Sequence, residues 1–148
     1  MEQVRVLVVG ESAALRQQVR YILLQQNFIV LEALDLQAGL KKLRQEPIRL
    51  IVVDIQFQFS SLVLFLSHVR RLQGDREVPL LLLREEKQLP AQTDSMPVSP
   101  AVSGRIEIEG IDFYYLTKPF SSLGMNGIVK KIFTDTLSSF PHYSQPSA

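Results

Sequence analysis

The sequence predicts a doubly wound α/β domain in which a five-stranded parallel sheet carries helices on both faces. Short apolar runs rich in Val, Ile and Leu recur along the chain, as expected of strands that are buried on both faces. Segments with helical spacing of apolar residues separate these runs, and such alternation is typical of a parallel sheet. The length of 148 residues suits one domain with a sizeable core.

The first expected strand is Val4–Val9, which is rich in β-branched residues and ends at the interruption Gly10-Glu11-Ser12. An amphipathic helix follows, because apolar residues recur there at i, i+4, i+7 and i+8. Asn27 stands where the C-terminus of this helix favours a residue that tolerates the left-handed backbone conformation. The apolar positions of the helix are Leu15, Val19, Ile22 and Leu23.

Phe28–Leu31 is the second expected strand. Asp35 is a suitable N-cap for a second helix, and Pro47 ends that helix because proline cannot continue it. Leu50–Val53 then reads as the strongest strand of the chain, and it ends at Asp54.

A third helix is expected from Ser60 or Ser61, followed by a buried strand over Pro79–Leu83 that ends at Arg84. The regular alternation stops after that strand. Residues 86–109 contain three prolines, too many for an uninterrupted helix, so this Pro-rich insertion replaces the fourth helix.

Within the insertion, Arg105–Glu109 alternates polar and apolar residues and predicts a short exposed strand. Phe113–Leu116 is the last expected core strand, and a final helix begins near Ser122. We therefore expect one domain over residues 1–139 and a disordered polar tail over residues 140–148.

Composition excludes several classes of function. The net charge is +1, from 16 basic and 15 acidic residues, which argues against a dedicated nucleic-acid surface. The chain has no cysteine, which rules out disulfides and thiolate chemistry, and its two histidines, His68 and His142, lie far apart. The N-terminus has no signal-peptide pattern, and no apolar run approaches the roughly 20 residues that a membrane span needs. We expect a cytoplasmic protein without a membrane partner.

Polar residues stand at the ends of several expected strands. Ligands of open α/β sheets bind at the carboxyl ends of the strands. Gly10, Glu11, Asp54 and Arg84 all occupy such ends, so they should meet in space although they are distant in sequence.

Asp54, Tyr115 and Lys118, with their places relative to the expected strands, together resemble the receiver family of bacterial response regulators. Asp54 closes the third strand, and Lys118 lies in the run Leu116-Thr117-Lys118-Pro119-Phe120 after the last strand. Tyr115 lies three residues before that lysine. The resemblance extends over residues 4–139 but fails over residues 86–109.

The resemblance implies a flavodoxin-like receiver fold and a set of site roles. Asp54 takes the position of the aspartate that accepts a phosphoryl group from a histidine kinase. Lys118 takes the position of the lysine that neutralises phosphoryl oxygens. Glu11, Asp54 and the backbone carbonyl of Gln56 take the positions of Mg²⁺ ligands. Arg84 and Tyr115 take the positions of the switch residues.

The sequence departs from the family at two of these positions. Gly10 replaces one residue of the acidic pair that helps to hold Mg²⁺, and Arg84 replaces a hydroxyl residue. If Arg84 points inward, Glu11 and Asp54 face Lys118 and Arg84, and the formal charge of the pocket is zero. Arg84 could then pair with Asp54 in place of the metal, or its head group could reach solvent instead. We therefore expect weak Mg²⁺ binding.

Three functions remain open at this point. The first is a single-domain signalling protein of a two-component phosphorelay, acting through protein contact, with weakened phosphoacceptance at Asp54. The second is a phosphorylation-independent pseudo-receiver that binds a protein. The third is an enzyme on a similar sheet, and it is the least favoured. Gly10 stands alone where a dinucleotide-binding domain needs a Gly-rich turn, and Gln56 stands where an aspartate-based phosphatase usually has a second aspartate. The expected partner is a histidine kinase or a downstream effector.

Overall fold

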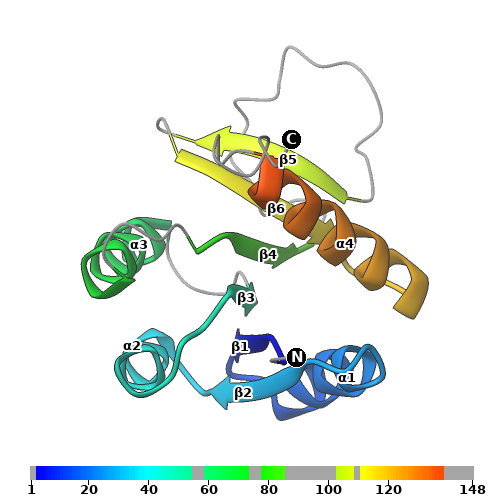
Figure 1. Cartoon of the computed structure of the whole chain (residues 1–148), viewed down its shortest axis with the longest axis horizontal. Coiled ribbons are helices and arrows are strands. Elements are labelled where there is room, and N and C mark those ends of the chain that lie inside the picture. The colour runs from blue at the N-terminus through cyan, green and yellow to red at the C-terminus, as the bar shows by residue number, and fades with distance from the viewer. Residues whose placement is uncertain (1–2, 55–58, 74–77, 86–102, 109–110, 139–148) are drawn as a thin grey trace, which may run out of the picture.

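The structure is a computed structural model, and it describes residues 3–54, 59–73, 78–85, 103–108 and 111–138. Strands and helices alternate along most of this part of the chain, and the strands form one sheet (Figure 1). The elements in chain order are β1 (Arg5–Val9), α1 (Ala13–Leu24), β2 (Ile29–Ala33), α2 (Leu36–Gln45), β3 (Leu50–Asp54), α3 (Phe59–Gln73), β4 (Leu80–Arg84), β5 (Ser103–Ile108), β6 (Ile111–Thr117) and α4 (Ser122–Ser138).

The sheet has the strand order β2-β1-β3-β4-β6-β5. The first five strands in this order pair in parallel, which confirms the five-stranded parallel sheet expected from the sequence. β5 adds a sixth strand, antiparallel to β6, at the edge of the sheet. It lies where the alternating pattern of residues 105–109 predicted a short strand.

The helix ends follow local chemistry. The side chain of Ser12 accepts a hydrogen bond from the backbone N–H of Leu15 and caps α1, and Asp35 caps α2 in the same way through the N–H of Ala38. Asn27 has a φ of 68°, which confirms the left-handed residue expected after the first helix. α2 ends two residues before Pro47, as predicted.

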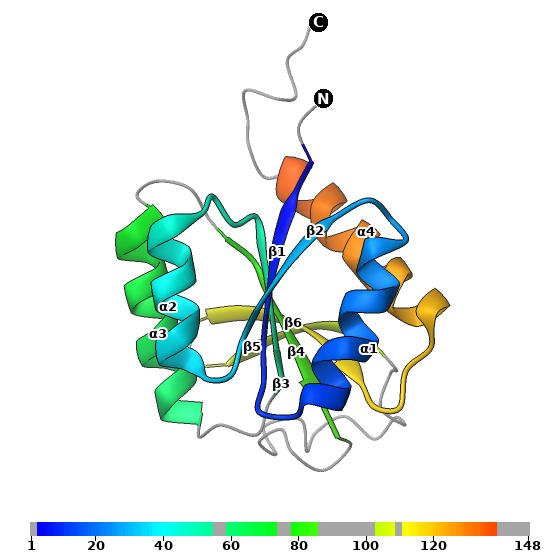
Figure 2. The same cartoon turned by 90° about the horizontal axis from the view of Figure 1, so that it is seen from below.

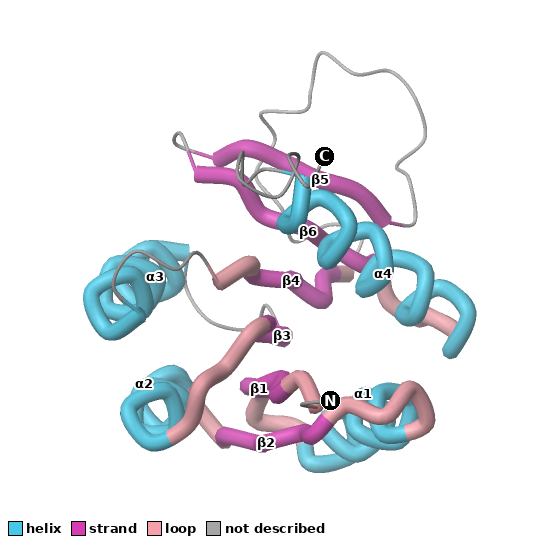
Figure 3. Tube along the Cα trace, viewed as in Figure 1, coloured by secondary structure: helices cyan, strands magenta, loops and turns pink. Residues whose placement is uncertain are grey.

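Two helices cover each face of the sheet, with α1 and α4 on one face and α2 and α3 on the other (Figures 1 and 3). Alternate residues of each central strand supply the two cores. In β1, Leu7 and Val9 pack toward α2 and α3, whereas Val6 and Val8 pack toward α1 and α4. Because the central strands are apolar on both faces, the sheet is a rigid platform for the polar residues at its carboxyl edge.

The carboxyl ends of β1, β3, β4 and β6 follow one another along a single edge of the sheet (Figure 2). Gly10, Asp54, Glu85 and Lys118 stand at or just after these ends. The loop residue Gln56, most of the Pro-rich insertion (residues 86–102) and the tail lie outside the described residues. None of the described helices combines the length and apolar character that crossing a bilayer requires.

Candidate functional site

The center of the site is an ion pair between Asp54 and Lys118. Nζ of Lys118 donates a hydrogen bond to Oδ1 of Asp54 over 2.7 Å. The Asp54 side chain is 1% exposed and the Lys118 side chain 18%, so the carboxylate lies deep in the site and the lysine closes it from the solvent side. A charged hydrogen bond in such surroundings is stronger than an exposed one.

The sheet explains why these two residues meet. Asp54 pairs with Leu83 of β4, and Leu83 pairs with Leu116 of β6, so Asp54 and Leu116 lie in one row across three strands. Lys118 follows Leu116 by two residues and therefore belongs to the same face of the strand. Neighbouring strands are about 4.8 Å apart. A long lysine side chain can span the intervening end of β4, which a shorter residue could not.

The second oxygen of the carboxylate has no described partner. Asp54 Oδ2 is buried and makes no hydrogen bond, and the same is true of Arg84 Nε and Thr117 Oγ1 at the ends of the next two strands. These are three of the four such side-chain atoms found among the described residues. Buried polar atoms without partners are uncommon in folded proteins, and their concentration here marks the carboxyl edge as the functional site.

Gly10 lies beside Asp54. A Cβ at this position would lie 3.1 Å from Cβ of Asp54 and 3.8 Å from its Oδ2. Arg16 donates from Nη1 to the carbonyl oxygen of Gly10 and from Nε to Glu32, which ties the turn after β1 to β2. The structure thus places a residue without a side chain beside Asp54, where an acidic residue was expected from the family pattern.

The residues expected to hold Mg²⁺ fit that ion only in part. Asp54 Oδ2 is an oxygen donor without a partner, whereas Glu11 is exposed at the turn after β1 and Gln56 lies outside the described residues. The described ranges contain no group of three or more His, Cys, Asp or Glu that could hold a metal ion. The role of Glu11, Asp54 and Gln56 as ligands stays a prediction.

Arg84 takes neither of the two positions considered from the sequence. It is 6% exposed, so its head group does not reach solvent, and it forms no ion pair with Asp54. Its guanidinium lies over the ring of Tyr115, with Cζ 4.4 Å from the ring centroid, within the range of a cation–π contact. Tyr115 packs against the core on the α2–α3 face. The contact therefore brings the two expected switch positions together.

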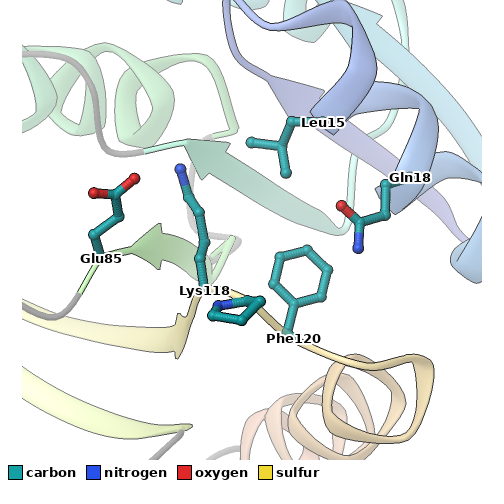
Figure 4. A pocket seen from close by; sticks show the side chains of 6 residues that line it. Leu15, Gln18, Glu85, Lys118 and Phe120 are labelled. Atoms are coloured by element: carbon teal, nitrogen blue, oxygen red, sulfur yellow. The ribbon is translucent and has the colours of Figure 1, made fainter.

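A cleft opens on the solvent side of Lys118 (Figure 4). Leu15 and Gln18 of α1 form one wall, and Glu85 after β4 lies beside Lys118 on the other. The ring of Phe120 lies between these walls. The cleft joins the buried carboxylate, through Lys118, to a surface that a partner can reach.

Sequence reasoning missed Thr117 and Arg16. Thr117 precedes Lys118 in the run that carries the resemblance, and its Oγ1 has no partner; its position one residue from Lys118 was the available signal. Arg16 contacts Gly10 and Glu32 across the turn, and that arrangement depends on the pairing of β1 with β2. A single sequence contains no signal for it.

Comparison with solved structures shows the same fold in receiver domains. The Vibrio cholerae chemotaxis protein CheY4 superposes with a TM-score of 0.65 at 20% identity, covering 88% of this chain and 99% of CheY4. A CheY-like receiver domain protein from Methanospirillum hungatei gives 0.65 at 17% identity, covering 91% and 97%. The beryllofluoride-activated NtrC4 receiver domain dimer gives 0.64 at 19% identity, covering 89% and 98%. The flavodoxin-like receiver fold is therefore confirmed.

Sequence comparison gives a weaker but consistent result. The phosphate regulon transcriptional regulatory protein PhoB of Escherichia coli is 26% identical over 128 residues, which cover 86% of this chain and 51% of PhoB. The PhoB proteins of Shigella dysenteriae and Shigella flexneri match to the same extent. The chain thus spans about half the length of the curated relatives that it matches. No protein-family model matches it.

Proposed function

We propose that this chain is a receiver-type signalling module of a two-component phosphorelay, in which Asp54 accepts a phosphoryl group with reduced efficiency. The observation that carries the proposal is the Asp54 carboxylate, which pairs through Oδ1 with Lys118 at 2.7 Å and keeps a second oxygen without a partner. Signal output is contact with a protein, either a histidine kinase upstream or an effector downstream. The proposal assigns no independent catalysis and a cytoplasmic location.

The chemistry follows from the two oxygens of Asp54. Oδ2 has an uncommitted lone pair for attack on the phosphorus of a donor. An O–P bond forms while the donor's own bond to phosphorus breaks, and the electrons of that bond leave with the ring nitrogen of a phosphohistidine or with the bridging oxygen of acetyl phosphate. Lys118 is positioned to offset the negative charge of the added group, as charge-assisted hydrogen bonds to phosphoryl oxygens do. The two residues stand at the ends of β3 and β6, which flank β4 in the same sheet.

Two features reduce the efficiency of this site. Gly10 supplies no carboxylate beside Asp54, and Arg84 is held over Tyr115 rather than at the phosphoryl position. Mg²⁺, when bound, would be held by Glu11, Asp54 and the carbonyl of Gln56, and it would offset charge on the transferring group. Loss of a residue that supports a metal site typically lowers affinity by roughly 10- to 100-fold.

The second candidate is a pseudo-receiver that binds its partner without phosphorylation. The contact between Arg84 and Tyr115 favours it, because a buried guanidinium already holds the ring in one position. In this case Asp54 and Lys118 are a structural ion pair. The partner would bind at the cleft, and Asp54 would stay unphosphorylated.

Intact mass measurement separates the two candidates. The protein is incubated with acetyl phosphate and Mg²⁺, and the first candidate expects slow addition of one phosphoryl group that is absent in Asp54→Ala. Asp35→Ala is the matched control, since Asp35 is an exposed helix cap and should leave phosphorylation unchanged. If the wild-type mass never changes, or changes equally in Asp54→Ala, phosphoacceptance at Asp54 is rejected.

A further inference from the structure

The chemistry proposed above gives no role to Arg16, although this side chain reaches the residue beside Asp54. Its guanidinium has acceptors in two different elements. Nη1 donates to the carbonyl oxygen of Gly10 in the turn after β1, and Nε donates to Oε1 of Glu32 on β2 over 3.0 Å. The Arg16 side chain is 17% exposed, so both contacts lie mostly out of solvent. Charge-assisted hydrogen bonds in such surroundings hold their partners firmly.

Gly10 is held through both of its backbone polar groups. Its N–H donates to the carbonyl oxygen of Ala33 over 3.0 Å, and its own carbonyl oxygen accepts from Arg16. Ala33 and Glu32 are neighbours on β2, so both bonds lead to the same strand. β2 is separated from β3, the strand of Asp54, by β1 (Figure 1). The edge strand β2 therefore fixes a backbone segment that lies beside Asp54.

The fixed segment lies next to the free oxygen of Asp54. The Cβ position of residue 10 is 3.1 Å from Cβ of Asp54 and 3.8 Å from Oδ2, the oxygen that makes no hydrogen bond with the described residues. Oδ1, by contrast, is held by Lys118. A shift of the Gly10 backbone would change the room beside Oδ2, the oxygen proposed to attack phosphorus.

The contact from Arg16 also fixes the start of the next residue. A peptide unit is planar, so the carbonyl group of Gly10, the N–H of Glu11 and the two Cα atoms move as one body. Arg16 holds this body at its oxygen. The contact therefore sets where the Glu11 side chain begins, and Glu11 is a residue for which a metal-ligand role is predicted.

The fork of arginine suits this arrangement. Nε and Nη1 lie in one rigid plane, so a guanidinium that is fixed at Glu32 presents Nη1 to Gly10 in a set direction. Lysine has one nitrogen at the end of a flexible chain and cannot hold both acceptors in this geometry. Arg20, one turn further along α1, also approaches Glu32, with Nε 3.7 Å from Oε2, but it is 51% exposed. Its ion pair is therefore the weaker of the two.

We propose that Arg16 is a positioning residue for the phosphorylation of Asp54, and that Glu32 holds Arg16 in place for this task. Arg16 acts through the Gly10 peptide, which sets the room beside Oδ2. The inference rests on the proposed function, because it concerns the rate at which Asp54 accepts a phosphoryl group. Misplacement of reacting groups by about 1 Å can lower a rate by about 100-fold, so loss of this contact should be measurable.

Phosphorylation rates of the full chain test the proposal, with acetyl phosphate and Mg²⁺ as reagents and intact mass as the readout. Arg16→Met removes both donors and should lower the rate constant by about 10-fold or more. Arg16→Lys should keep part of the rate, since one of the two bonds can form. Arg20→Met is the matched control, because it removes an arginine from the same helix and the same carboxylate. It should change the rate by less than about 2-fold.

Two variants at Glu32 separate position from charge. Glu32→Gln keeps a side-chain oxygen that can accept from Nε of Arg16, so its rate should lie closer to the wild type than to Arg16→Met. Glu32→Leu removes the acceptor, and its rate should approach that of Arg16→Met. If Arg16→Met fails to fold, Glu32→Leu and Arg16→Lys provide the same test.

The amide ¹⁵N resonance of Glu11 gives a readout that does not depend on phosphorylation. A hydrogen bond to the Gly10 carbonyl polarises the peptide unit that the two residues share and shifts this nitrogen. In the unphosphorylated protein the resonance should move in Arg16→Met and Glu32→Leu, and it should keep its place in Arg20→Met. A loss of stability alone would not move the resonance of a molecule that is still folded.

The outcomes distinguish this inference from the proposed function. A folded Arg16→Met variant that is phosphorylated at the wild-type rate overturns the inference, and so does an equal loss of rate in Arg20→Met. In both cases the wild-type protein is phosphorylated, and the proposed function stands. An unchanged Glu11 resonance in Arg16→Met also overturns the inference, since the contact would then be absent. A wild-type chain that takes up no phosphoryl group rejects the proposed function and this inference together.

Discussion

Lys118 reaches past the end of β4 to Asp54, a residue 64 positions earlier in the chain, and donates to its Oδ1. The contact joins β3 to β6, two strands that do not pair with each other. It leaves the carboxylate with one paired and one unpaired oxygen. The same lysine lines the cleft toward solvent, so one side chain belongs both to the buried pair and to the accessible surface (Figure 4).

Removing the lysine should destabilise the protein. Lys118→Ala leaves Asp54, which is 1% exposed, as a buried charge without its partner. We expect the free energy of unfolding to fall by about 3 kcal/mol, the lower end of the range for breaking a buried pair. Urea unfolding followed by far-UV circular dichroism measures it.

The matched control for this experiment is Lys130→Ala, which removes an exposed lysine from α4 and should change stability by no more than about 0.5 kcal/mol. Asp54→Ala in the Lys118→Ala background should recover part of the loss, since no buried charge remains. Equal losses for the two lysine variants would contradict a stabilising role for the pair.

Restoring a carboxylate at position 10 should strengthen Mg²⁺ binding. Gly10→Asp places its Cβ about 3.1 Å from Cβ of Asp54, and only a small adjustment is needed there. We expect Mg²⁺ affinity to rise by at least roughly 10-fold. Isothermal titration calorimetry, or NMR titration of the backbone amides, measures it.

Gly10→Ala is the control for this substitution, because it adds the same Cβ without the carboxylate. It should bind Mg²⁺ no better than the wild type. In the absence of the ion, Gly10→Asp should also be less stable than Gly10→Ala, since a second carboxylate then lies beside Asp54. If Gly10→Ala gains affinity equally, the missing carboxylate is not what weakens the site.

The contact between Arg84 and Tyr115 should be measurable by a double-mutant cycle. The variants Arg84→Met and Tyr115→Leu keep much of the apolar volume and remove the cation and the ring. We expect a coupling energy of about 1 kcal/mol in favour of the wild-type pair, because the guanidinium lies 4.4 Å from the ring centroid and is buried.

A second cycle on the opposite face of β6 gives the comparison. Arg105 lies 5.6 Å from the ring centroid of Tyr114 and is exposed, so its coupling should be smaller, about 0.5 kcal/mol. Both cycles use urea unfolding. A coupling at Arg84 that is no larger than that at Arg105 would show that burial does not strengthen the contact.

The meeting of Asp54 with Lys118 could be predicted because it depends on features that a single sequence contains. Apolar runs fix the strands, parallel order fixes the edge at which they end, and both residues stand at such ends. The environment of Arg84 could not be predicted in this way. Its chemistry allowed two positions for the guanidinium, paired with Asp54 or in solvent. The position found, over the ring of Tyr115, depends on packing between β4 and β6.

The sixth strand shows the same limit. Alternating residues predicted a strand near Arg105–Glu109, and β5 is found at Ser103–Ile108, but its partner and direction did not follow from the pattern. Gly104 pairs with Tyr115, and a Cβ there would lie 3.1 Å from the hydroxyl oxygen of that tyrosine, so a larger residue would need the ring to shift. This close approach becomes visible only when the two strands are side by side.

Asn27 gives a prediction in which sequence and structure agree in detail. Its φ of 68° lies in the left-handed region, where a side chain with Cβ is disfavoured and asparagine is better tolerated than most residues. Asn27→Ala should therefore lower the free energy of unfolding by about 1 kcal/mol, whereas Asn27→Gly should leave it unchanged or raise it slightly. Urea unfolding of the two variants measures the difference.

Gln26→Ala is the control for position 27, because Gln26 is an exposed neighbour in the same turn and its φ is not positive. It should change stability by less than about 0.5 kcal/mol. The carbonyl oxygen of Asn27 accepts a hydrogen bond from Gln3, and this backbone contact is kept in both Asn27 variants, so it cancels in their comparison. If Asn27→Ala and Asn27→Gly were equally stable, the backbone conformation would not be what selects asparagine at the end of α1.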